Sequence, residues 1–189
     1  MGRETITIIR SDRRTISLQI TRDGQVQVRA PRHMSDADIR AFVESKSTWL
    51  AKHLRKKEHD MASLQEEGRF TEAEIKRLQT LAKKVIPQKV AYYSRLMGVS
   101  YGRISIRKQK SRWGSCSREG NLNFNCLLMM APPEVLDYVV VHELCHRLEM
   151  NHSSRFWAQV ERVMPDYRRP KGWLKEHGGR LMIRAHGKE

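Results

Sequence analysis

The chain has 189 residues, enough for one domain with a substantial apolar core or for one domain with a small addition. Lysine and arginine number 36 against 21 aspartates and glutamates, which gives a formal net charge of +15 at pH 7 and favours an anionic partner. Hydrophobic residues make up 39% of the chain and fall in patterned runs, which argues against global disorder.

No segment resembles a membrane span or a signal peptide. The longest apolar run is Cys126 to Ala131, whereas a span needs roughly 20 residues. The first residues, MGRET, lack the apolar core of a secretory signal. We therefore expect a cytoplasmic protein without a membrane partner. The 3 cysteines are few and odd in number, which favours reduced thiols over a disulfide framework.

The first thirty residues alternate apolar and polar side chains in three runs. Breaks fall at residues 11–14 and 22–24, and the second break contains an Asp-Gly pair that tight hairpins favour. This pattern predicts a three-stranded antiparallel β-meander. Ser35 then opens a capping pattern, and helical spacing of apolar residues continues to about Leu54. We expect an N-terminal domain of meander plus helix over residues 1–60.

A polar stretch without apolar period covers residues 55–68 and indicates either a linker or a solvated continuation of the helix. Thr71 and Glu74 form a second capping box, which predicts a helix start. Pro87 should kink or restart this helix, and Gly98 is a suitable end.

Strand-like alternation returns between residues 103 and 130, with a loop through 111–120. The pattern Pro-Pro-Glu at 132–134 then marks a helix start, because proline is tolerated in the first turn and an acid there complements the helix dipole. We expect these elements to form a second domain over residues 70–189.

The helix after this start carries His142-Glu143-Leu144-Cys145-His146, the HExxH pattern of zinc-dependent hydrolases. Two histidines four residues apart share one helix face, so both imidazoles can reach a single Zn²⁺ ion. His152 follows six residues later, just after Asn151, which tolerates the left-handed conformation that would turn the chain back toward the metal. The sequence thus predicts three histidine ligands for one zinc ion, with Glu143 as the catalytic base.

This site predicts metal-assisted hydrolysis. Zinc lowers the pKa of its bound water toward ~7, Glu143 takes the proton and passes it to the leaving group, and the metal polarises a carbonyl or phosphoryl oxygen.

Other interpretations of these residues remain open. The histidines could be hydrogen-bonded members of an ordinary amphipathic helix. A closed structural zinc site is less favoured, because it usually takes four Cys or His ligands, whereas three leave a position for water. Cys145 points about 100° away from His146 on the helix and is assigned to the core. Glu149 is either an acceptor for an imidazole N–H or a surface acid.

A set of further motifs accompanies the HExxH motif. They are Arg112-Trp113-Gly114-Ser115-Cys116, Asn121-Leu122-Asn123-Phe124-Asn125, Asp137 to Val141, Asn151-His152, Phe156-Trp157 and, near the start, Arg29-Ala30-Pro31. In this combination the chain resembles the YgjP-like metallopeptidases, which are related to the WLM and SprT-like zincins. The resemblance implies an α+β, zincin-like fold with zinc ligands His142, His146 and His152 and with Glu143 as base. Cys126 departs from the pattern, since an aromatic is common there, and could alter a pocket wall.

Three residues are predicted to bind substrate. In zincin folds the strand before the active-site helix can accept an extended peptide along its edge, which here points to residues 121–130 and to Asn125. The basic stretch 101–118 enters the proposed site through Arg112 and Trp113. These two residues could instead brace the loop by a cation–π contact.

The leading function is a zinc-dependent hydrolase of the metallopeptidase type, in which Glu143 activates the zinc-bound water. One alternative is a nucleoside triphosphate (UTP) pyrophosphatase with the same site, because some members of the resembled family carry that assignment and the basic cluster could grip phosphates. Another is a nucleic-acid-binding module with a structural metal, since Arg and Lys near Tyr167 and Trp173 suit phosphate contact and base stacking. The sequence leaves open the natural substrate, the physiological metal, any preference for DNA or RNA, and the oligomeric state.

Overall fold

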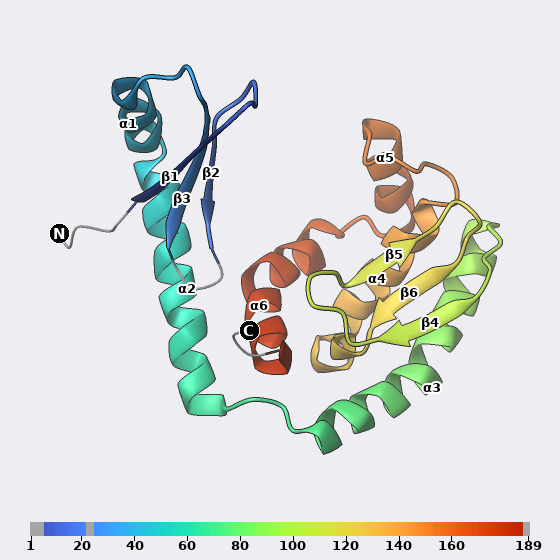
Figure 1. The fold of residues 1–189 in the computed structure, drawn as a ribbon. Helices are drawn as coiled ribbons and strands as arrows, with labels where there is room; N and C mark the ends of the chain where they lie inside the picture. The colour runs from blue at the N-terminus through green and yellow to red at the C-terminus, as the bar shows by residue number, and fades with distance from the viewer. Residues whose placement is uncertain (1–5, 22–24, 187–189) are drawn as a thin grey trace. The chain divides into compact units, whose positions relative to one another are not determined.

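The computed structural model describes residues 6–21 and 25–186 and divides into two compact units, Met1–Glu67 and Gly68–Gly187. Helices and small sheets occur together in the ribbon (Figure 1), which confirms the α+β class. The predicted Asp-Gly turn at 22–24 lies outside the described residues. Among the helices described, none has the length and apolar character needed to cross a bilayer.

The sheet of the first unit contains β1 (Ile6–Ser11), β2 (Ser17–Ile20) and β3 (Val26–Pro31) in the order β1-β3-β2. β3 pairs antiparallel with β2 but parallel with β1, so the topology differs from the predicted antiparallel meander. The central position belongs to β3 because it carries the fully buried Val28 and Ala30. A strand between two neighbours has both backbone edges hydrogen-bonded, as buried backbone requires.

Two helices complete the first unit, α1 (Asp36–Ser45) and α2 (Ser47–Glu67). Ser35 caps α1 as predicted, and Ile39 of α1 packs in a small core with β3. The predicted single helix is broken at Lys46, which ends α1. α2 extends well beyond the predicted end near Leu54, so residues 55–67 continue the helix and do not form an extended linker.

The second unit begins with the long helix α3 (Glu72–Met97). Thr71 and Glu74 form the predicted capping box, and Gly98 ends the helix in the left-handed conformation with φ 67°. Pro87 lies inside α3 and does not divide it into two helices, contrary to the expectation of a restart.

The second sheet contains β4 (Ile104–Arg107), β5 (Gly114–Cys116) and β6 (Leu122–Asn125) in the order β4-β6-β5. β6 is therefore the central strand, with both edges paired, and the predicted peptide-binding edge at 121–130 is wrong. The edge strand beside the HExxH helix is β5, which the sequence pattern had placed in a loop. The apolar run after β6 is a 3-10 helix, η1 (Cys126–Met130), and not a strand.

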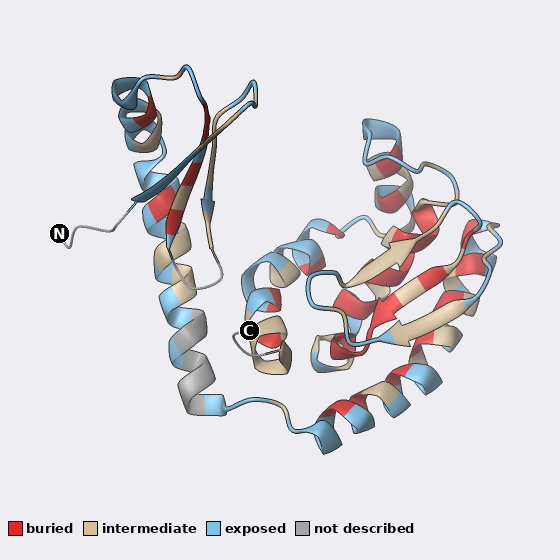
Figure 2. Ribbon diagram, viewed as in Figure 1, coloured by how far each residue is buried: buried red, intermediate tan, exposed pale blue. Residues whose placement is uncertain are grey.

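The unit is completed by α4 (Pro133–Cys145), α5 (Ser154–Val163) and α6 (Arg168–His186). α4 contacts α3, α5, α6, β5 and η1 and is buried along most of its length. Buried residues on α3, α4 and β6 face one another (Figure 2), and they form one core cluster. The helix that carries the HExxH motif is thus the best-supported helix of the unit.

Candidate metal centre

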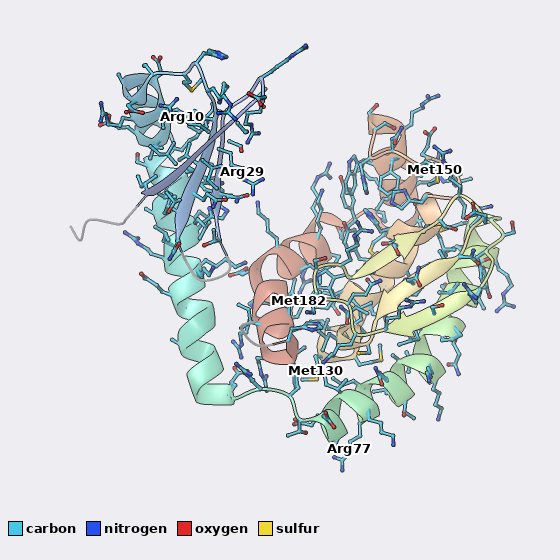
Figure 3. The ribbon with its side chains drawn as sticks, viewed as in Figure 1. Arg10, Arg29, Arg77, Met130, Met150 and Met182 are labelled. Atoms are coloured by element: carbon cyan, nitrogen blue, oxygen red, sulfur yellow. The ribbon has the colours of Figure 1, made fainter. Side chains whose placement is uncertain are left out.

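A hollow of about 320 Å³ opens between β5 and the C-terminal end of α4. We call it the histidine hollow, and its lining residues are Arg112, Gly114, Ser115, Cys116, His142, Glu143, His146, Met150 and His152. Met150, labelled in Figure 3, comes from the turn after α4. The β5 residues and Met150 were missed as site residues, because a three-residue strand and a single methionine give no periodic signal.

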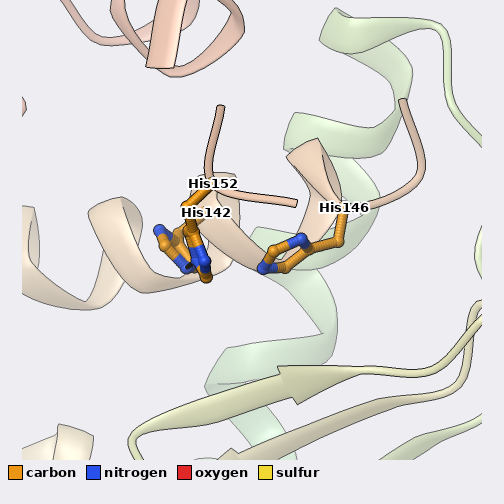
Figure 4. Close-up of side chains that lie close together, drawn as sticks. All are labelled: His142, His146 and His152. Carbon is orange, nitrogen blue, oxygen red and sulfur yellow. Dashed lines mark hydrogen bonds between the residues drawn. The ribbon is translucent and has the colours of Figure 1, made fainter. Parts of the chain in front are cut away.

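The three predicted ligands meet in the histidine hollow (Figure 4). One ring nitrogen from each of His142, His146 and His152 can be chosen so that all lie within 4.8 Å of one another. The Nε2 atoms of His142 and His152 are 2.9 Å apart. Nitrogens that share a tetrahedral zinc ion lie roughly 3.3 Å apart, given Zn–N bonds of about 2.0–2.1 Å. The donor set therefore fits a single zinc ion.

Helix geometry positions the first two histidines. His142 lies in the last turn of α4 and His146 is its C-cap residue, still with helical dihedral angles of φ −65° and ψ −13°. A spacing of four residues then places both imidazoles on one face. Nδ1 of His146 lies 3.2 Å from the carbonyl oxygen of Glu149 and can donate to it, which leaves Nε2 as the free lone pair.

The third histidine is positioned by a helix cap and not by the predicted left-handed Asn151. No described residue other than glycine has a positive φ angle. Instead, Ser153, which follows His152, is the N-cap of α5 and accepts a hydrogen bond from the backbone N–H of Phe156 at 3.3 Å. The N–H of Ser153 donates to the carbonyl of Asn151 at 2.8 Å, which closes the turn.

Two aromatic residues of α5 pack against the three imidazoles. The ring of Phe156 is fully buried, and its centroid lies 4.9, 4.7 and 4.7 Å from those of His142, His146 and His152. Trp157 stacks on the exposed His152 at 5.9 Å with an interplanar angle of 28°. Sequence reasoning had assigned this pair to the family pattern without a role. Its position four and five residues after the third histidine is the signal that was available.

Burial favours the neutral form of His142 and His146, which is the form that binds metal. Burial, followed by the neighbouring histidines, lowers the pKa of His142 to about 3. Burial also lowers the pKa of His146. Nδ1 of His142 is buried and has no hydrogen-bond partner among the described residues, and the ring packs edge-on against Phe156.

Glu143 is 5% exposed and faces the same hollow. Burial raises the pKa of its carboxyl to about 8, and the nearby Arg112 acts in the opposite direction. A cation held by the histidines would act in the same direction as Arg112 and lower this pKa, since a nearby positive charge favours the carboxylate. The pKa of Glu143 therefore lies near neutral pH, which suits a general base.

Of the three predicted substrate residues, the structure brings Arg112 to the hollow and leaves Asn125 and Trp113 outside its lining. The side chain of Asn125 is fully buried and donates to the carbonyl oxygens of Gln109 and Arg112 at 2.8 and 3.0 Å. It also accepts from the N–H of Leu127 at 3.1 Å. Asn125 therefore holds the loop that carries Arg112, and its buried side chain is not part of the lining of the histidine hollow.

Trp113 packs against the core and against Gly178 of α6, where an added Cβ would lie 3.0 Å from the indole ring. These contacts of Trp113 with the core and with α6 are apolar. Glu149, whose role was open, pairs through its carboxylate with Arg155 at 3.4 Å. Cys126 is fully buried in the core and forms no pocket wall.

Known proteins that are similar to this chain include one family and two solved structures. The family described as YgjP-like, metallopeptidase domain, matches residues 14–78 and 71–177. A metallopeptidase zymogen, abylysin of Pyrococcus abyssi, is 22% identical, covers 48% of this chain and 94% of its own, and superposes with a TM-score of 0.44. The zymogen of jannalysin from Methanocaldococcus jannaschii is 20% identical with coverages of 48% and 93% and a TM-score of 0.43. A search among curated proteins finds no match.

Proposed function

The chain belongs to the YgjP-like metallopeptidase family, and on this premise we propose that it is a zinc-dependent peptidase. His142, His146 and His152 hold one Zn²⁺ ion, and Glu143 is the general base. The observation that carries the proposal is the convergence of three imidazoles and one buried carboxyl in a single open hollow. Three protein ligands leave a coordination position open, which is typical of catalytic and not of structural zinc.

The chemistry divides between the ion and the chain. A zinc ion bound by the three imidazoles supplies a Lewis acid that acidifies water and polarises the scissile carbonyl. Glu143 accepts the proton of the attacking water and returns it to the leaving amine. Its carboxyl is confined between α4 and the backbone of Gly114, so it keeps one orientation in the hollow. A fixed base does not need to reorganise during the reaction.

The edge of β5 supplies a place for the peptide backbone. β5 pairs with β6 on one side, and within the described part of the chain no strand pairs with its other side. An extended peptide can add to such an edge through main-chain hydrogen bonds. All three residues of β5 line the histidine hollow, so a peptide bound along this strand would pass beside Glu143.

Two alternatives use the same residues differently. A nucleoside triphosphate pyrophosphatase would bind phosphate through Arg112, the cation that lines the hollow. A nucleic-acid-binding module would use the overall positive charge and keep the metal as a structural element. A pyrophosphatase forms different products from a peptidase, and a binding module forms no product, so one set of assays separates the three.

The test compares the wild-type chain with Glu143→Gln. We expect one zinc per chain in both proteins, and chelator-sensitive cleavage of an unfolded protein by the wild type alone. Glu161→Gln, which removes a surface carboxylate paired with Arg168, is the matched control and should cleave normally. Release of pyrophosphate from nucleoside triphosphates without peptide cleavage would favour the first alternative. Metal-independent binding of DNA or RNA without either turnover would favour the second.

A further inference from the structure

We propose that Arg112 binds a carboxylate of the substrate beside the scissile bond, so that this enzyme prefers peptides with an acidic group at that subsite. The inference rests on the proposed peptidase function and specifies its substrate class. It goes beyond the predicted contact of Arg112 with substrate, because it states which chemical group the guanidinium recognises.

The charges of the histidine hollow are the first argument. Apart from the histidines, the lining of this hollow contains one cationic side chain, Arg112, and one acidic side chain, Glu143. The carboxyl of Glu143 is buried. Arg112 is exposed at the opening, and no acidic side chain in the described ranges forms an ion pair with it. The charge of Arg112 is felt by Glu143, but that carboxyl is buried, so the exposed guanidinium is available to an anionic group of the substrate.

The backbone around Arg112 is fixed although its side chain is exposed. Asn125 donates to the carbonyl of Arg112, and the N–H of Asn125 donates to the carbonyl of Trp113 at 2.9 Å. Trp113 packs between the core and Gly178 of α6. Two successive peptide groups are thus anchored to the buried end of β6. Anchoring of the backbone lowers the entropy that binding through this arginine would cost.

The position of Arg112 along the chain is the third argument. It lies two residues before Gly114, where the free edge of β5 begins. A peptide aligned along that edge would therefore carry one of its side chains, or its terminus, past the guanidinium. Arginine binds carboxylates with paired, charge-assisted hydrogen bonds, which gives both affinity and orientation.

Other cations near the site are less suited to this role. Lys171 lies over the ring of Trp157, 3.6 Å from its centroid, and is held there by a cation–π contact. Arg155 pairs with Glu149. The general positive charge of the chain then attracts acidic substrates at long range, while Arg112 selects them at the site.

The experiment uses matched fluorogenic peptides that differ only in Asp against Asn, or Glu against Gln, at each position around the cleaved bond. Each is made with a free and with an amidated C-terminus, because the carboxylate could come from a side chain or from the terminus. We expect kcat/KM of the zinc-loaded wild type to be about 10-fold higher for the acidic peptide at one position, the scale of a single charge-assisted contact at a partly solvated site.

Arg112→Gln should remove this preference, and Arg112→Glu should shift it toward lysine at the same position. Arg107→Gln is the matched control, because Arg107 is an exposed arginine on β4, the opposite edge of the sheet, and should keep the preference. Peptide binding to inactive Glu143→Gln, with and without Arg112→Gln, gives a second measurement that is independent of turnover.

Equal preference in the wild type and in Arg112→Gln would overturn the inference while leaving the peptidase function intact. Absence of any acidic preference in an active wild type would do the same. If zinc-loaded protein cleaves no peptide but binds nucleoside triphosphates through Arg112, both the proposed function and this inference fail.

Discussion

Gly114 of β5 lies so close to Glu143 of α4 that a Cβ atom at residue 114 would be 2.5 Å from Oε1 and 2.7 Å from Cγ of the glutamate. Real Cβ atoms do not approach other heavy atoms so closely, because repulsion rises steeply below van der Waals contact. Glu143 can therefore lie this close to β5 only because residue 114 is a glycine. Movement of either would change the distance between the peptide-binding edge and the base.

Gly114→Ala is therefore expected to displace Glu143 and to lower kcat by about 100-fold, the lower end of what a positioned general base contributes. Zinc binding should persist, because the three histidines come from other positions. The check is kcat together with zinc stoichiometry. Gly172→Ala on α6 is the matched control, since nothing lies within 4 Å of a Cβ there. Unchanged kcat in Gly114→Ala would contradict the proposed fit.

The convergence of the proposed metal ligands was predictable from sequence because their placement is local. A spacing of four residues on a helix brings His142 and His146 to one face whatever the rest of the fold does. Caps such as Thr71 and Ser35 are local for the same reason, and both are confirmed. His152 was found by its distance along the chain, although the turn that positions it uses Ser153 and not Asn151.

The elements that sequence reasoning missed depend on partners distant in the chain. Alternation shows that a strand has two faces but not which strand lies beside it, so the parallel pairing of β1 with β3 could not be read from the pattern. β5 has only three residues and no alternation. Asn125 was assigned to substrate because it is polar, and its burial against two loop carbonyls becomes evident only in the folded chain.

The buried Glu143 predicts a pH-dependent stability of the metal-free protein. The pKa of Glu143 is about 8 in the folded chain, whereas the ordinary value for a glutamate is 4.5, so folding favours the protonated form. This group therefore destabilises the folded state progressively as pH rises from about 4.5 to about 8. Glu143→Gln should remove the effect and exceed the wild type by roughly 2–4 kcal/mol in unfolding free energy at pH 8.

Urea unfolding in the presence of a chelator at several pH values measures this difference. His142, whose pKa is lowered to about 3, acts in the opposite sense: stability falls as pH drops below 6.5, because the unfolded histidine takes up the proton first. That contribution is common to both proteins and cancels in the comparison. A difference that stays constant between pH 5 and pH 8 would contradict the burial of an ionisable carboxyl here.

Trp157 is predicted to hold the exposed ligand His152. Trp157→Leu removes the stacked ring but keeps an apolar side chain, so we expect zinc affinity to fall about 10-fold, as loss of a ligand-orienting contact does. Competition with a chromophoric chelator measures the affinity. Trp173→Leu is the control, since Trp173 contacts a histidine ring, His177, that is outside the histidine hollow. Equal affinities of the two variants would show that the stack does not support the metal site.

Asn125 was predicted to contact substrate, but its side chain is buried, and a substitution can test its structural role. Asn125→Ala leaves the carbonyls of Gln109 and Arg112 and the N–H of Leu127 without their partner, so unfolding free energy should fall by about 1–3 kcal/mol. Met182 of α6, labelled in Figure 3, lies 3.7 Å from the same amide and cannot replace it. Because the loop then loosens, the acidic-peptide preference through Arg112 should weaken while preference at other positions is unchanged. Loss of activity toward all peptides with unaltered stability would instead place Asn125 in direct contact with substrate.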